Sequence, residues 1–183
     1  MMGAMARKPV AREAVLDAFE SLLITEGERA ATLDAVAKLA GVSKGGLLYH
    51  FPNKEAMISV LLERLDRLLA EDLAAMAAAP EGAAAYFIRS SVWADTPLDR
   101  VFVAATRLAE VAHAETLRRM AGVQASWLAL LAADVGPAMA KPVLYMGDGL
   151  YFNAMLARGP GEAPAEVAGD VESLLAAVER LRG

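Results

Sequence analysis

Six residues with polar or unusually small side chains occur together in the stretch "AGVSKGGLLYHFPNKEA", residues 40–56: Lys44, Gly45, Gly46, Tyr49, His50 and Lys54. A glycine inside a helix costs about 0.5–1 kcal/mol relative to alanine, so two adjacent glycines need a compensating reason, such as close approach to another surface. The pattern favours a DNA groove, with residues 44–46 at base edges and the other three side chains near phosphates. Taken singly, the glycines would only loosen a loop and the polar residues would be ordinary surface; their joint spacing favours DNA.

Two short helices and a tight turn must position these residues. Apolar spacing predicts helices over 33–40 and 44–50, with Gly41 in the turn between them, where a left-handed backbone is cheap only for glycine. Thr32 and Ser43 are suited to cap the two helices. Val42 would fill the angle between them, and the residues that would close the core around it are Val36, Ala37, Leu47 and Phe51. The arrangement is a helix-turn-helix.

The rest of the chain also has helical periodicity. The expected helices are 10–26 before the motif, a long helix over 54–79 capped by Asn53, and then 82–93, 98–110, 113–133, 138–157 and 164–182. No segment alternates with a period of two, and no internal repeat is present. The predicted fold class is therefore all-α.

Composition excludes several classes of protein. The 183 residues include no Cys and two His, so no disulfide framework and no cysteine metal site are expected. The sequence has no glycine-rich phosphate loop after a strand and no His-Glu metal spacing, so neither an enzyme, a cofactor nor a metal site is predicted. No apolar run reaches the roughly 18 residues of a membrane span and no signal peptide is recognisable; we expect a cytoplasmic protein without a membrane partner.

The net charge of -5 is unevenly distributed. Residues 1–55 hold seven of the 18 basic and seven of the 23 acidic residues, leaving 11 basic and 16 acidic residues for 56–183. A neutral front and an acidic back suggest two separate functions, although ordinary solvated surface explains the charges equally well. The neutral front predicts modest non-specific affinity for DNA.

The segment 32–63, "TLDAVAKLAGVSKGGLLYHFPNKEAMISVLLE", resembles the DNA-binding motif of the TetR family of bacterial transcriptional repressors. The resemblance implies a three-helix helix-turn-helix domain over 1–55 and a helical ligand-binding and dimerisation domain over 56–183. Leu48 departs from the pattern, because many relatives have Tyr there, and Asp34 is acidic where relatives approach DNA. The implied DNA-binding residues are Thr32, Ser43, Lys44, Gly45, Gly46, Tyr49, His50 and Lys54.

The last helix carries a narrow apolar seam with 4-3-4-3 spacing, which is typical of a helix that packs on a partner helix. Two such helices from each subunit would form the four-helix dimer interface that the family uses, and a dimer would read a palindrome. Gly147 and Gly149 would permit the close approach. An internal hairpin is the alternative. The predicted interface residues are Met146, Leu150, Asn153, Val167, Val171, Leu174, Val178 and Leu181.

Large apolar side chains are concentrated in the middle helices. Such a set is commonly plain core, but the resemblance favours a cavity for a small apolar or aromatic effector. His113, Gln124 and Asn153 are the expected orienting contacts. The predicted pocket residues are Phe87, Trp93, Phe102, His113, Met120, Gln124, Trp127, Tyr151 and Met155.

These predictions combine into one hypothesis: a homodimeric, ligand-responsive regulator that binds a double-stranded operator, as a repressor, and is released by its effector. The helix over 54–79 would join the two domains and carry the ligand-induced shift. The alternative is a helical protein-interaction module with a non-functional helix-turn-helix.

Overall fold

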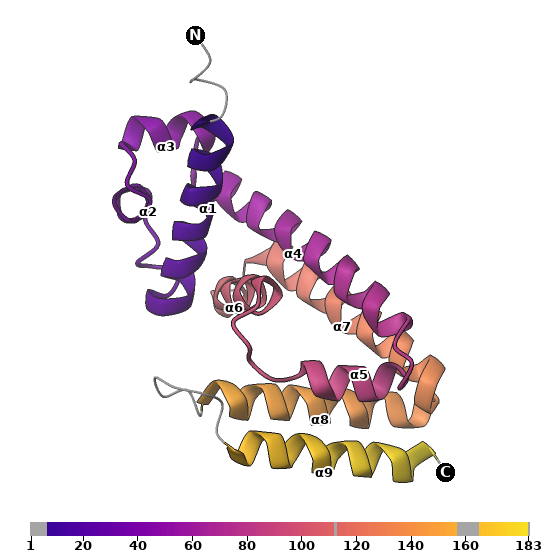
Figure 1. The fold of residues 1–183 in the computed structure, drawn as a ribbon. Helices are drawn as coiled ribbons and strands as arrows, with labels where there is room; N and C mark the ends of the chain where they lie inside the picture. The colour runs from indigo at the N-terminus through magenta and orange to yellow at the C-terminus, as the bar shows by residue number, and fades with distance from the viewer. Residues whose placement is uncertain (1–6, 112, 157–164, 183) are drawn as a thin grey trace. The chain divides into compact units, whose positions relative to one another are not determined.

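The chain is helical throughout the part that the computed structural model describes, residues 7–111, 113–156 and 165–182. No strand occurs in these ranges, so the all-α prediction is confirmed, and every helix bound lies within three residues of its predicted place. The helices are α1 (Arg7–Glu26), α2 (Leu33–Leu39), α3 (Lys44–His50), α4 (Lys54–Ala77), α5 (Ala83–Ser90), α6 (Pro97–Glu110), α7 (Ala114–Val135), α8 (Pro137–Leu156) and α9 (Ala165–Arg182) (Figure 1).

The helices form two compact units, each made of two separate stretches of sequence. Unit 1 combines residues 1–68 with 97–120, and unit 2 combines 69–96 with 121–183. The divisions fall inside α4 and inside α7. A single cut after residue 55, as the sequence suggests, therefore does not coincide with the compact units.

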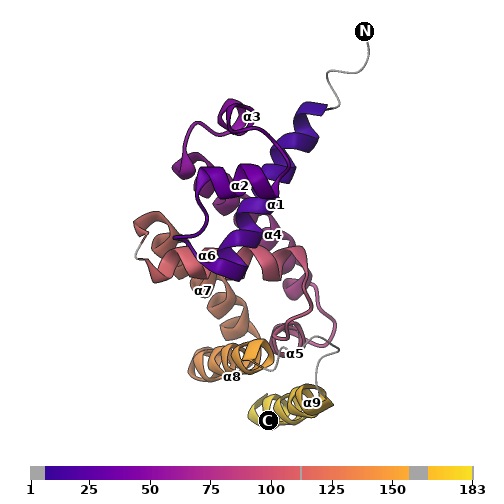
Figure 2. The ribbon, with the colours of Figure 1, turned by 90° about the vertical axis from the view of Figure 1, so that its left-hand side faces the viewer.

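Unit 1 contains the helix-turn-helix. Gly27 ends α1 with φ +84°, and its N–H donates to the carbonyls of Leu22 and Leu23, which is a common helix C-terminal pattern. α1 packs against α2, α3 and α6, and Figure 2 shows α6 crossing beside α1. The core consists of side chains that are at most 1% exposed, among them Phe19, Leu47, Phe51, Met57 and Leu61.

Unit 2 is built on three helices, α5, α8 and α9, each of which packs on the other two. α8 and α9 lie side by side in both views (Figures 1 and 2). The Tyr86 hydroxyl donates to Asp72 at 2.9 Å; burial first, and then this hydrogen bond, raise the pKa of Tyr86 to about 12. The hydroxyl therefore stays a proton donor at any physiological pH.

Candidate nucleic-acid interface

The turn between α2 and α3 is built as the sequence predicts. Gly41 has φ +68°, in the left-handed region. The hydroxyl of Thr32 accepts from the Ala35 N–H at 3.2 Å, and that of Ser43 accepts from the Gly46 N–H at 3.0 Å, so both residues are side-chain N-caps. The predicted supporting core is confirmed: Val36, Ala37, Leu47 and Phe51 are buried, and Val42 is half-buried.

One side of α3 is exposed. Leu47 is buried, Gly46 and His50 are intermediate, and the exposed residues are Lys44, Gly45, Leu48 and Tyr49. Since successive helix residues are about 100° apart, Leu48 and Gly45 lie at the centre of this exposed side, with Lys44 at one edge and Tyr49 at the other. Tyr49 is 69% exposed, and its ring lies edge-to-face with that of His50, at a centroid distance of 5.2 Å.

Lys44 makes an ion pair within the chain. Its Nζ lies 3.0 Å from Oδ2 of Asp34, in the first turn of α2, and both side chains are more than half exposed. An exposed pair of this kind contributes only about 0–1 kcal/mol, so Lys44 can exchange this carboxylate for another acceptor at little cost. Asp34 thus offsets the one positive charge at the start of α3.

Lys54 is held more firmly than Lys44, and its predicted phosphate contact stays a prediction. Its Nζ donates to the backbone carbonyl of Glu28 at 2.6 Å and to Oε1 of the same residue at 2.7 Å, and the side chain is 24% exposed. These contacts tie the start of α4 to the loop that follows α1. In the described structure Lys54 is a positioning residue, because its ammonium is already satisfied by two oxygens.

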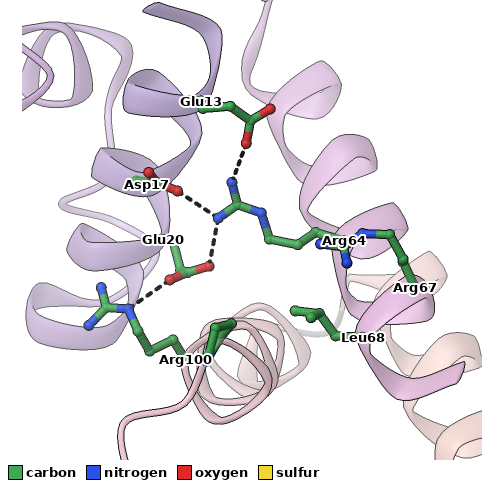
Figure 3. Close-up of a pocket in the computed structure, with 8 residues that line it drawn as sticks. Glu13, Asp17, Glu20, Arg64, Arg67, Leu68 and Arg100 are labelled. Atoms are coloured by element: carbon green, nitrogen blue, oxygen red, sulfur yellow. Dashed lines mark hydrogen bonds and ion pairs between the residues drawn. The ribbon is translucent and has the colours of Figure 1, made fainter. Parts of the chain in front are cut away.

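A charged cluster joins α1, α4 and α6 inside unit 1 (Figure 3). The Arg64 guanidinium faces three carboxylates of α1, at 2.7 Å from Glu13, 2.7 Å from Asp17 and 3.1 Å from Glu20. Glu20 also accepts from Arg100 of α6 at 3.0 Å. The side chains border a surface cavity of about 480 Å³.

Glu20 is the centre of this cluster, because only about 5% of its side chain is exposed and it bridges two arginines. Burial alone would lower the pKa of Arg64, but the hydrogen bonds that its guanidinium donates to Asp17 and Glu13 and the negative charge of Glu20 outweigh burial and raise that pKa. The cluster links three helices of unit 1 through its ion pairs. This cluster could not be predicted from the sequence. Glu20 is separated from Arg64 by 44 positions and from Arg100 by 80, and helical periodicity does not connect residues so far apart.

The predicted pocket residues are divided between the two units. Phe102, His113 and Met120 belong to unit 1, and the other six belong to unit 2. Within unit 2, Phe87 lies 5.5 Å from Trp127 between ring centroids, and the rings of Trp93 and Tyr151 lie 6.3 Å apart. Met155 is half-buried, and Gln124 is exposed on α7.

His113, predicted to orient a ligand, makes contacts within the chain itself. Its Nδ1 accepts from the Thr116 N–H at 3.3 Å, so the ring caps the start of α7, and its Nε2 lies 3.1 Å from Oε2 of Glu55. Both ring nitrogens are therefore occupied within unit 1. Asn153 is likewise turned to its own helix, because its amide donates to the Gly149 carbonyl at 2.8 Å.

The apolar seam of α9 packs inside unit 2, as expected if α8 and α9 form an internal hairpin. Val178 is fully buried and Val167 is 7% exposed; Leu150 of α8 is buried with them, and Met146, Val171 and Leu174 pack against the same core. Val178 has no exposed surface left for a second copy, and Val167 and Leu150 have little; the interface role of the set stays a prediction. The side chain of Leu181 lies outside the described residues.

The side of α8 away from this core is exposed and carries two large aromatic side chains together with Lys141 and Asp148. Tyr145 is 58% exposed and Phe152 is 61% exposed, and the two are separated by two helical turns with Gly149 between them. Gly147 does permit a close approach, but to α5, where an added Cβ would lie 2.6 Å from Oγ of Ser91. At Gly149 an added Cβ would meet nothing within 4 Å.

No helix in the part of the chain that the structure describes is both long enough and apolar enough to cross a membrane. The exposed side of α3 is supported by the helix-turn-helix and its two capping hydroxyls. An exposed helix of this size can enter the major groove of DNA.

Comparison with known proteins agrees with this geometry. A family model described as "Bacterial regulatory proteins, tetR family" matches residues 15–61. The HTH-type transcriptional regulator BetI of Rhizobium meliloti (strain 1021) is 30% identical over 180 residues, which cover 91% of this chain and 89% of BetI. The HTH-type transcriptional regulator RutR of Escherichia coli (strain K12) is 43% identical over 83 residues, 42% of this chain and 37% of RutR.

A solved structure shares the fold. The multidrug binding protein EbrR, complexed with malachite green, superposes with a TM-score of 0.65 and 19% identity over 93% of this chain and 96% of EbrR. Since BetI matches almost the whole chain and the family model covers the helix-turn-helix, the chain belongs to the tetR family of bacterial regulatory proteins and is a DNA-binding transcriptional regulator, not an enzyme.

Proposed function

We propose that this regulator is a repressor that binds a palindromic operator as a homodimer and is released by an apolar or aromatic small molecule. The observation that carries the operator proposal is the exposed side of α3, where Lys44, Gly45 and Tyr49 project from a capped and well-supported helix. Lys44 is the proposed base contact at one edge, and Tyr49 the proposed phosphate contact at the other.

Operator binding is tested by fluorescence anisotropy with the intergenic DNA that flanks the gene, at several salt concentrations. We expect saturable binding that survives competitor DNA. Lys44→Ala should weaken it about fivefold or more, because a good base contact discriminates by roughly 1–3 kcal/mol. Tyr49→Phe, which removes only the hydroxyl, should weaken binding to all sequences alike, as loss of a phosphate contact does.

Arg118→Ala is the matched control for the loss of one cation, since Arg118 is exposed, belongs to unit 1 and pairs with Glu115 on its own helix. It should leave operator affinity within about twofold. A Lys54→Ala variant is a poor probe of phosphate contact, because it also breaks the tie to Glu28. Equal binding by the wild type and the Lys44→Ala variant would contradict the proposed base contact.

The homodimer is proposed to form through the exposed aromatic side chains of α8 rather than through the α9 seam. Large apolar side chains that are more than half exposed, such as Tyr145 and Phe152, favour an interface, and Gly149 leaves room for a second helix between them.

Phe152→Asp should convert the dimer to monomer in sedimentation velocity at micromolar concentration, because a carboxylate would be buried unpaired at the contact. Leu117→Asp is the control: Leu117 is 47% exposed on α7 and lies outside the proposed face. A Phe152→Asp protein that remains dimeric would contradict this interface.

The effector proposal rests on the aromatic side chains of unit 2 and on the neighbour EbrR, whose title describes it as multidrug-binding and complexed with malachite green. Because the unit boundary falls inside α4, that helix is the proposed carrier of a change from one unit to the other, and Arg64 ties it to α1. Release of labelled operator by added aromatic compounds is the assay.

One observation favours the interaction-module alternative: Lys44 and Lys54 are both paired with carboxylates of the chain itself. If those ion pairs persist beside DNA, the positive charges of Lys44 and Lys54 are not available to bases or phosphates. Absence of any sequence preference in selection from random duplexes would favour that alternative.

A further inference from the structure

The exposed side of α3 has no hydrogen-bonding side chain at its centre. Leu48, 39% exposed, and Gly45 occupy the centre, while the polar groups of Lys44 and Tyr49 lie at its edges. A leucine on such a surface cannot donate to a phosphate or to a base edge. It can make only an apolar contact, and in the major groove the apolar group on a base is the 5-methyl of thymine.

Gly45 fits the same interpretation. An alanine Cβ at this position would meet nothing within 4 Å, so the chain itself does not require the glycine. Alanine would in addition favour the helix by up to about 1 kcal/mol. The missing side chain beside Leu48 therefore allows the helix backbone, and Leu48 with it, to come close to the base edges.

We propose that Leu48 is a specificity-determining residue that contacts the methyl group of one thymine in each operator half-site. The inference rests on the proposed operator binding and goes beyond it, since it predicts which chemical group of which base is read. Burying one methyl-sized group corresponds to about 0.8 kcal/mol, or about fourfold in affinity per half-site and about fifteenfold for a symmetric pair.

The test removes that methyl group alone. After an operator is obtained by selection from random duplexes, each thymine is replaced in turn by deoxyuridine, which pairs as thymine does but lacks the 5-methyl. We expect one symmetric pair of positions at which the wild-type protein loses about fifteenfold in affinity, and we expect the Leu48→Ala protein to bind both duplexes within twofold of each other.

Leu39→Ala is the matched control, because Leu39 is a leucine of the neighbouring helix α2 and is 56% exposed. It should keep the full sensitivity to deoxyuridine. Circular dichroism melting checks that the Leu48→Ala protein is folded, as expected for a partly exposed residue.

Failure of this inference and failure of the proposed function give different results. A protein that selects no sequence fails as an operator-binding regulator. Selection of an operator whose deoxyuridine substitutions have no effect, or whose effects persist in the Leu48→Ala protein, leaves operator binding intact and overturns the contact. Equal weakening of operator and random DNA by Leu48→Ala also overturns it, because the leucine would then pack only on the DNA backbone.

Discussion

Gly147→Ala should destabilise unit 2 by about 1–3 kcal/mol. The added Cβ would lie 2.6 Å from Oγ of Ser91 and within 2.9 Å of the Phe87 ring, in the contact between α8 and α5. Both neighbours are buried, and the Ser91 hydroxyl donates to the Phe87 carbonyl at 2.6 Å, so neither side chain can turn away freely. Inserting an extra methyl group into a well-packed core typically costs this amount of stability. We expect the cost to exceed the stabilisation that alanine gives a helix relative to glycine.

Urea unfolding followed by tryptophan fluorescence measures this effect, because both tryptophans, Trp93 and Trp127, belong to unit 2. Gly122→Ala is the matched control: it is also a helix-interior glycine of unit 2, exposed, with nothing within 4 Å of an added Cβ. It should stabilise the protein by up to about 1 kcal/mol. A Gly147→Ala protein as stable as the Gly122→Ala protein would show that α5 and α8 are not in close contact.

Glu20→Gln should destabilise unit 1 by about 1–3 kcal/mol. The amide keeps the shape of the carboxylate but removes the charge that bridges Arg64 and Arg100, in a site where only about 5% of the Glu20 side chain is exposed. Loss of one partner of a buried ion pair is costly, and the cost is reduced here because Arg64 keeps Glu13 and Asp17.

Asp17→Asn tests whether burial sets this cost, because Asp17 accepts from the same guanidinium as Glu20 but its side chain is 61% exposed. It should cost no more than about 1 kcal/mol. Circular dichroism follows the whole chain and tryptophan fluorescence follows unit 2 alone, both at one protein concentration. Equal losses in the two variants would contradict the role of burial.

Local rules made the helices and the turn predictable. Each helix has its apolar spacing and end signals within its own sequence: Gly27 and Gly41 supply the left-handed turns, and Thr32 and Ser43 supply the caps. The exposed side of α3 follows equally from sequence, since Leu47 is the buried residue of this helix and helical geometry places Lys44, Gly45 and Tyr49 away from it.

Long-range pairing was not predictable in this way. Nothing in the sequence near Lys54 indicates Glu28 as its partner, and nothing near Glu20 indicates Arg100. The α9 seam was correctly predicted to be apolar and it packs on α8, but the sequence left open whether a second copy also covers it, because helical spacing defines only which face is apolar.

The sequence by itself determined the helices, the helix-turn-helix and the resemblance to the family, because these depend on contacts between residues close together in the chain. Tertiary structure decided which carboxylate pairs with each lysine, which aromatic side chains of α8 are left exposed and why Gly147 must be small. These depend on which helices meet, and that choice is made by the packing of the entire core rather than by any local pattern.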